Sequence, residues 1–449
     1  MSSGHEQHGD HGAHGHFEPH HEPKALPASL AAPPVLAAWR MRALIASAVF
    51  TVLSLLFLGT HEGRNHLLRA YLDGYMMCFN LAGGGLCMLM LQYVSGGKWG
   101  LLLRRPLEAM SRTLPLVALL CIPILIPYLG GHLYQWVRYP DTASTNAALL
   151  QGLVTKEQAL TANFKRPMLN PSMLVVESCG IFAILLLIMF TLNRWSLQQD
   201  ADPDRGTDFS YERWRIKFEN LSGPGIVIYV VLMTVGAVVW IKALDVTWYS
   251  SIWGLQFLVA QGYGVLAFGI LSVILLSRYE PMKSLLRTTE QHDLGKLAFA
   301  FVMLNIYLTF AEFLIIWSGN LPDEIPWYLN RIRGGWWVIC SLDFICHWLI
   351  PFVILLSRDI KRSKSKMIWV CCWMLFARLV DLFWLIEPNF KGAAQNLVAE
   401  PLSIFAYLTV PIAVLGLWVA YYITNLMKRP LVVVNDPHLE EMLEPEHAH

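Results

Sequence analysis

Residues 335–357 read GWWVICSLDFICHWLIPFVILLS, and this stretch indicates both the fold class and the unusual chemistry of the chain. An α-helix of about 20 apolar residues crosses the hydrocarbon core of a bilayer, and this run has that length. It nevertheless contains Asp343 and His347. An ionisable side chain at mid-bilayer depth costs on the order of 2.5 to 3.5 kcal/mol on insertion scales, so such groups are expected to face one another or a wet cavity.

Apolar runs of similar length recur along most of the 449-residue chain, in which 55% of the residues are hydrophobic and 15% are charged. We therefore predict an all-α polytopic membrane protein with ten transmembrane helices. The predicted spans are 41–60, 69–95, 114–131, 172–194, 223–242, 249–277, 295–318, 335–357, 367–387 and 401–426. The first span is too long and too far from the N-terminus for a secretory signal, so it is kept as a helix.

The distribution of basic residues predicts the orientation of these spans. With the N-terminus in the cytoplasm, the inner segments carry 23 Lys and Arg residues and the outer loops carry ten. Cytoplasmic loops of membrane proteins are enriched in Lys and Arg, so both termini are predicted to be cytoplasmic. The formal net charge of +1 gives no reason to expect nucleic acid or another strongly charged partner.

The eight central spans divide into two sets of four, and each set begins with a long helix that contains several glycines. Glycine lets helix backbones approach closely in lipid, and parallel repeats with a site between them are a known membrane design. A basic amphipathic stretch follows each of these helices, at 99–112 and at 279–292. The predicted segments are a flanking helix at 41–68, four-helix bundles at 69–242 and 243–400, and a last flanking helix at 401–428.

The two ends of the chain are polar. Residues 1–40 combine seven histidines with Gly, Pro and Glu and cannot bury a core, so we predict a disordered cytoplasmic tail. The histidines from His5 to His14 recur every third residue, which could chelate a transition metal loosely, although a polar tail needs no metal to explain it. The acidic segment 429–449 is interpreted in the same way.

Cysteine and histidine patterns argue against a redox cofactor in this chain. All eight cysteines lie within predicted spans and are interpreted as small core residues. The sequence contains no CxxCH and no clustered CxxC, so c-type haem, zinc and iron–sulfur sites are not expected. A b-type haem needs two deep histidines, and only His347 lies deep in a span. We therefore predict that the chain binds no metal and no redox cofactor.

The deep polar residues of spans seven to nine form the main candidate site. Asp343 and His347 lie one helical turn apart, and Arg378 and Asp381 are three residues apart, so each pair occupies one helix face. An Asp–His pair can hold a proton and can hydrogen-bond a quinol hydroxyl. The Arg–Asp pair serves equally well as a lock between helices. A polar stripe on span seven extends the site and consists of Asn305, Thr309 and Glu312.

Other polar features lie towards the predicted outer side. A second polar group in the first bundle consists of Asp73, His132 and Glu177. Two outer loops are long, at 132–171 and 319–334. The second loop contains aromatic residues, which are common at the membrane interface for purely interfacial reasons but which could also form a docking surface for an extrinsic partner.

A resemblance to a known family enters at residues 305–337, which read NIYLTFAEFLIIWSGNLPDEIPWYLNRIRGGWW. This segment resembles the ActF-type membrane subunit of bacterial alternative complex III, the second quinone-type subunit, which is related to the NrfD and polysulfide reductase membrane subunits. The ten-span layout and the long polar N-terminus extend the resemblance over most of the chain. Members of this family often read FSQF or YSQ where this chain has FAEF at 310–313, so Glu312 departs from the family pattern.

The resemblance implies a respiratory, quinol-oxidising complex of the bacterial inner membrane. In such a complex, electrons pass through iron–sulfur and multihaem c-type subunits to a cytochrome c or an adjoining terminal oxidase. The implied partners are an NrfD-like sister membrane subunit, an iron–sulfur subunit, multihaem and monohaem cytochrome c subunits, and a terminal oxidase. This chain would supply a proton half-channel and a second, quinol-proximal pocket without a cofactor of its own. It would be a subunit of the oxidoreductase rather than a stand-alone catalyst.

Two other functions fit the residues. A secondary transporter would use the charged cluster to bind a substrate or a coupling ion, although transporters usually break their helices with Pro or Gly at the site, and spans seven and nine have neither near their charges. A scaffold subunit would use the ion pairs for assembly alone. The residues identify neither the quinone nor the electron acceptor, and they do not indicate whether protons cross the whole membrane.

Overall fold

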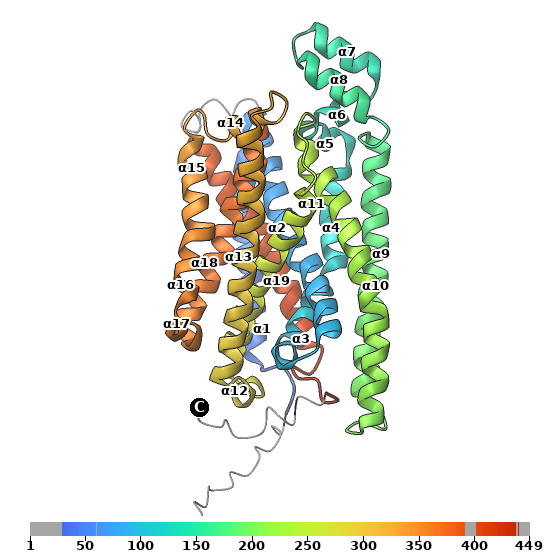
Figure 1. The fold of residues 1–449 in the computed structure, drawn as a ribbon, viewed down its shortest axis with the longest axis vertical. Coiled ribbons are helices and arrows are strands. Elements are labelled where there is room, and N and C mark those ends of the chain that lie inside the picture. The colour runs from blue at the N-terminus through green and yellow to red at the C-terminus, as the bar shows by residue number, and fades with distance from the viewer. Residues whose placement is uncertain (1–28, 60, 391–400, 437–438, 440–449) are drawn as a thin grey trace, which may run out of the picture.

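The computed structural model describes residues 29–59, 61–390, 401–436 and 439, and all of the regular secondary structure in these residues is helical (Figure 1). Ten segments of the described chain are long and apolar enough to cross a membrane. The prediction of an all-α polytopic membrane protein is therefore confirmed. The predicted tails at 1–40 and 429–449 lie mostly outside the described residues, as do residues 391–400. The prediction of disorder is wrong for their described parts, because the first helix begins at Val35 and because Leu431, Val432 and Val433 are buried.

Eight of the ten spans contain one long helix each. These helices are α1 (Val35–Leu55), α2 (His61–Ser95), α9 (Pro171–Asp200), α10 (Asp208–Trp240), α11 (Trp253–Leu276), α13 (Thr288–Gly319), α18 (Lys364–Ile386) and α19 (Pro401–Met427). The other two spans are built from consecutive shorter pieces. One consists of α3 (Lys98–Ser111) and α4 (Leu114–Leu125), and the other of α15 (Trp336–Asp343), the π-helical segment η3 (Phe344–Leu349) and α16 (Ile350–Leu356).

Short helices connect the spans at the two ends of the molecule. We call the end with α14 the upper end and the end with α12 and α17 the lower end, as in Figure 1. The short upper helices are α5 (Pro127–Leu133), α6 (Gln135–Arg138), α7 (Thr142–Leu150), α8 (Lys156–Lys165), η2 (Lys242–Leu244), α14 (Ile325–Asn330) and η4 (Glu387–Asn389). The remaining short helices are η1 (Leu56–Gly59), α12 (Met282–Leu285) and α17 (Arg358–Arg362).

The helices α2 and α11 form the centre of the fold. Helix α2 contacts α3, α4, α10, α11, α18 and α19, and α11 contacts α10, α13 and α18 as well. Glycines explain how closely these two helices approach. A methyl group added at Gly84 would lie 2.8 Å from Val265, and one added at Gly264 would lie 2.4 Å from the Asn80 amide nitrogen. The small residues expected to permit close packing therefore act between the two glycine-containing helices.

The flanking helices pack together on one side of this centre. Helix α1 packs along α19, and α19 packs against α2. Among the remaining helices, α9 contacts α4 and α10, whereas α13 contacts α11 and α16. This arrangement resembles two groups of helices, but α2 contacts α11 and α18 across the proposed boundary. The division into two bundles therefore stays a prediction.

The structure adds detail to two local expectations and corrects a third. The loop 132–171 contains helices, two of which begin with capping boxes that pair Asp141 with Ser144 and Thr155 with Gln158. The stretch 99–112 is mostly buried in the protein as α3. Not every cysteine lies in the core, because Cys179 and Cys372 are exposed on the outer faces of their helices.

Candidate functional site

The deep polar residues of three helices meet inside the protein. Asp343 is the last residue of α15, His347 lies in η3, and Asp381 lies on α18. All three are buried, and one ligand atom of each lies within 4.8 Å of those of the other two. The pairing expected from helix spacing is therefore present, and it joins two neighbouring spans.

His347 lies between the two carboxylates at equal distances. Its Nδ1 atom is 3.9 Å from Asp343 Oδ1 and 3.9 Å from Asp381 Oδ1. Both distances are too long for a hydrogen bond, for which about 2.7 to 3.2 Å is usual. Neither ring nitrogen of His347 has a hydrogen-bond partner, and neither does Asp343 Oδ1.

The π-helical segment η3 explains how His347 is held. A π-helix leaves the regular α-helical hydrogen-bond ladder, and such segments are frequent at functional sites. Side chains of neighbouring helices donate to carbonyl groups of this segment. The Tyr263 hydroxyl donates to the His347 carbonyl oxygen at 3.1 Å, and Trp373 Nε1 donates to the Cys346 carbonyl oxygen at 2.9 Å. The Tyr263 ring also packs edge-on against the imidazole.

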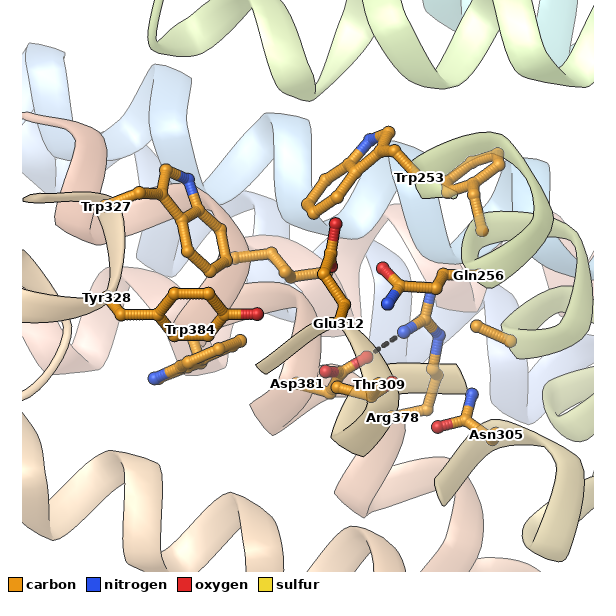
Figure 2. Close-up of a pocket in the computed structure, with 13 residues that line it drawn as sticks. Trp253, Gln256, Asn305, Thr309, Glu312, Trp327, Tyr328, Arg378, Asp381 and Trp384 are labelled. Carbon is orange, nitrogen blue, oxygen red and sulfur yellow. Dashed lines mark hydrogen bonds and ion pairs between the residues drawn. The ribbon is translucent and has the colours of Figure 1, made fainter. Parts of the chain in front are cut away.

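Arg378 pairs with Asp381 one turn away on α18, as the sequence spacing predicts. Both side chains line a cavity together with Asn305, Thr309 and Glu312 of α13 (Figure 2). The cavity has a volume of about 40 Å³, which is room for a small number of water molecules. Asp381 therefore links the buried His347 to a polar cavity.

The polar stripe of α13 is held by different partners at its two ends. Asn305 accepts a hydrogen bond from Trp348 Nε1 at 2.9 Å. Glu312 accepts one from the Ser250 hydroxyl. Thr309 lies between them at the cavity wall. The glutamate that departs from the family pattern is thus hydrogen-bonded and faces the same cavity as Arg378.

Aromatic residues close the cavity towards the upper end. Figure 2 shows Trp327, Tyr328 and Trp384 on the side of Glu312 away from Arg378. Trp327 and Tyr328 are buried, and Trp327 stacks on Trp248 with ring centroids 4.4 Å apart. Trp327 and Tyr328 are therefore not part of an exposed docking surface, and that expectation is wrong for these two residues. They are lining residues of an internal cavity.

Arg331 caps this aromatic group from above. Its guanidinium lies 3.5 Å from the centroid of the Trp327 ring and donates to the Leu385 carbonyl oxygen at 2.9 Å and to Asn389 at 3.0 Å. Burial lowers the pKa of Arg331 to about 9. This role of Arg331 was not predictable from the sequence, in which Arg331 is one of ten basic residues of the predicted outer loops.

The three residues of the second polar group have different surroundings. Asp73 of α2 is buried with its Oδ1 atom unpartnered, and it lies within electrostatic range of Arg378. It therefore adjoins the main cluster. Glu177 is half-buried on α9, and its Oε2 atom has no hydrogen-bond partner. His132 is half-buried on α5.

Sequence reasoning missed a polar group above Asp73. Arg69, one turn from Asp73 on α2, donates to Glu387 at 2.9 Å, and the Tyr407 hydroxyl donates to the same carboxylate. His66 Nδ1 lies 3.8 Å from Glu387 Oε1. The spacing of Arg69 and Asp73 was a signal for a shared helix face, but Glu387 in η4 and Tyr407 on α19, which complete the group, have no sequence signature.

The residues Asp343, His347 and Asp381 could also be considered as ligands of a divalent cation, since imidazole and carboxylate are common ligands. However, the guanidinium of Arg378 is paired with Asp381 and places a positive charge beside the same atoms. This charge disfavours a second cation. The expectation that the chain binds no metal stays a prediction.

Neither a scan against models of protein families nor a search of curated proteins finds a match to this chain. The resemblance to the alternative complex III subunit therefore stays a prediction that depends on residues 305–337 and on the ten-span layout.

Proposed function

We propose that this chain is a membrane subunit of a respiratory, quinol-oxidising complex and that it conducts protons between the His347 cluster and the upper end. The observation that carries the proton-conducting part is the position of His347, whose Nδ1 atom is 3.9 Å from carboxylates on two different spans. Imidazole exchanges protons readily near neutral pH. A histidine between two carboxylates, with neither ring nitrogen bonded, is suited to transfer a proton from one to the other.

The surroundings of His347 supply the continuation of such a path. Asp381 lines the cavity that also contains Glu312 and has room for water, so a proton on Asp381 could leave through ordered water molecules. Asp73 lies near Arg378 and is followed by the Arg69–Glu387 pair towards the upper end. The positive-inside rule predicts that this end is the outer side, where quinol oxidation would release protons.

The small cavity favours protons and water over a quinol ring in this structure. The cavity has a volume of about 40 Å³, whereas pockets for organic ligands usually have volumes of several hundred Å³. We therefore assign quinol chemistry to the implied sister subunit and proton conduction to this chain. A quinol-proximal pocket in this chain would require the aromatic side chains around Glu312 to move.

One observation favours the alternative of a proton- or ion-coupled transporter. The span that contains His347 has a π-helical segment followed by Pro351, so its helix is irregular at the charged site, as the helices of transporters often are. Spans seven and nine, in contrast, contain neither Pro nor Gly near their charges. The scaffold alternative is less favoured by the incompletely bonded histidine, since a lock between helices gains most from paired charges.

Co-purification tests membership of the complex. The full-length chain with an affinity tag would be extracted from native membranes in mild detergent, and its partners would be identified by mass spectrometry and by haem absorption. We expect iron–sulfur and c-type cytochrome subunits together with a second polytopic subunit. Recovery of the chain without redox proteins, combined with solute-dependent proton flux in vesicles that contain the chain alone, would instead establish a transporter.

A further inference from the structure

An apolar groove at the upper end contains two lysines and adjoins the aromatic group of the cavity through Trp248, which stacks on Trp327. It measures about 290 Å³ and lies where α9 begins and α10 ends. Phe164, Met168 and Tyr249 line it and are exposed, at 80%, 39% and 43% respectively. Because α9 and α10 are candidate membrane spans, the groove lies at the level of the lipid headgroups.

The charges of the groove are two cations and one anion. Lys165, the last residue of α8, donates to the carbonyl oxygens of Val246 at 2.6 Å and Trp248 at 3.4 Å. Lys242 donates to the Ser250 carbonyl oxygen at 3.2 Å. Both ammonium groups are therefore held in place by backbone oxygens, and neither of these bonds neutralises its charge.

Asp245, the one carboxylate that lines the groove, accepts its hydrogen bonds from the neighbouring residue Thr247. Asp245 accepts hydrogen bonds from the backbone nitrogen of Thr247 at 3.0 Å and from its hydroxyl at 2.5 Å. The groove thus has two positive charges and one negative charge over an apolar floor. Asp245 lies within electrostatic range of Lys165, and Glu312 of the neighbouring cavity lies within range of Lys242. Burial and the neighbouring charge of Lys242 lower the pKa of Lys165 to about 8, and the charge of Asp245 opposes this shift only in part.

We propose that this groove binds an anionic phospholipid, with the phosphate at Lys165 and Lys242 and an acyl chain along the apolar floor. Charge complementarity supports this occupant, because basic pockets at the ends of membrane helices bind acidic lipid headgroups. The aromatic rings support it too. The Lys165 ammonium lies 3.8 Å from the centroid of the Tyr249 ring, and aromatic rings gather at the interfacial level of a bilayer. This inference does not depend on the proposed proton path.

Native mass spectrometry of the delipidated full-length chain in detergent tests the proposal, with phosphatidylglycerol, phosphatidylcholine and inorganic phosphate as probes. We expect wild-type protein to retain phosphatidylglycerol and to prefer it to phosphatidylcholine. Lys165→Gln and Lys242→Gln should each weaken its binding about five-fold, since a lysine near an acidic lipid surface contributes roughly that factor. Lys156→Gln, at the exposed start of the same helix α8, is the matched control and should have no effect.

The variant Lys165→Arg separates charge from structure. Arginine keeps the positive charge and can bond to carbonyl oxygens, so this variant should restore phosphatidylglycerol binding if the charge is what matters. Binding by the wild type should also weaken between pH 7 and pH 9.5, because Lys165 is charged below its pKa and loses its charge above it. Lys165→Arg should weaken less over this range. The groups that face Lys165 are Lys242, Asp245 and Tyr249.

Three outcomes would overturn the proposal. Equal retention of phosphatidylglycerol and phosphatidylcholine would remove the role of charge. An equal loss of binding in Lys156→Gln would indicate general surface attraction. Inorganic phosphate bound as tightly as phosphatidylglycerol would mean that the groove recognises a free anion, and the acyl chain would have no part in binding.

Discussion

Two groups of buried charges in this molecule differ in how completely they are paired. At the lower end, Glu108 of α3 accepts hydrogen bonds from Arg105 at 2.6 Å, from Ser196 at 2.6 Å and from Arg429 at 3.0 Å. Arg105 also pairs with Asp200 of α9. Each of these charges has an opposite charge in direct contact, and the group joins α3, α9 and the segment after α19.

The upper cluster is different. Arg378 and Asp381 are paired, but His347 has no hydrogen-bond partner on either ring nitrogen and Asp343 Oδ1 has none. A cavity with room for water adjoins Asp381. The lower group, in contrast, joins chain segments that are distant in sequence by ion pairs.

The contrast separates two uses of charge inside a membrane protein. Pairing by several hydrogen bonds repays the desolvation of buried ions and holds helices together. Incomplete pairing costs stability, so its presence beside a cavity with room for water points to groups that must change their protonation state. We therefore interpret the lower group as structural and the upper cluster as functional.

The largest expected effect is on stability at the lower end. Glu108→Gln leaves Arg105 and Arg429 without their shared carboxylate, and removal of one partner from a buried ion pair costs about 3 to 5 kcal/mol. Thermal unfolding of the purified protein and its yield in membranes would measure this loss. Glu212→Gln is the control, because Glu212 pairs with Arg215 on an exposed surface, where such pairs contribute about 1 kcal/mol or less. Similar losses in both variants would break the comparison.

The second expected effect is on activity, through the water-sized cavity. Ala260 of α11 lines it and is buried, so Ala260→Leu should fill it. We expect quinol oxidation by the assembled complex to slow at least about ten-fold, since proton transfer typically contributes a factor of 10² or more. The loss of stability should stay within about 1 to 3 kcal/mol. Ala260→Ser, which keeps the residue small, should retain activity, and full activity of the leucine variant would show that the cavity carries no protons.

The smallest expected effect is at Glu387. This residue is buried towards the upper end, where Arg69 and Tyr407 donate hydrogen bonds to its carboxylate. Glu387→Gln should slow proton release about two- to three-fold, because the amide oxygen still accepts a hydrogen bond and only the charge is lost, which weakens the bond by roughly 1 kcal/mol. Stopped-flow measurement with a pH indicator would detect this change. A loss as large as that of the cavity-filling variant would instead mean that the charge of Glu387 itself is required for proton transfer.

Much of the fold follows from the sequence, because length and hydropathy determine which segments can cross a bilayer. Ten spans were predicted and ten are found. The helices often extend beyond the apolar runs. Helix α10 begins at Asp208, where the predicted span begins at residue 223, because its first half lies at the lower end and needs no apolar composition.

The site was predictable only in part. The spacing of Asp343 with His347 and of Arg378 with Asp381 indicated faces that meet, since antiparallel neighbours bring equal depths together. The π-helical turn at His347 was not predictable, because it depends on donors from Tyr263 and Trp373 on other helices. The electrostatic interaction of Asp73 with Arg378 and the burial of Trp327 also depend on contacts between distant segments, so the sequence alone does not predict them.

The most direct test of the central claim uses His347→Gln and Asp343→Asn in the complete complex, with assembly verified first. These changes keep the side-chain volume but remove titration. We expect both variants to assemble, to oxidise quinol on the order of 10²-fold more slowly and to lose the wild-type pH profile of proton release. Glu177→Gln, which alters a half-buried carboxylate on α9, should remain active. If both cluster variants keep wild-type turnover, pH profile and proton release, the cluster is structural and the chain is a scaffold.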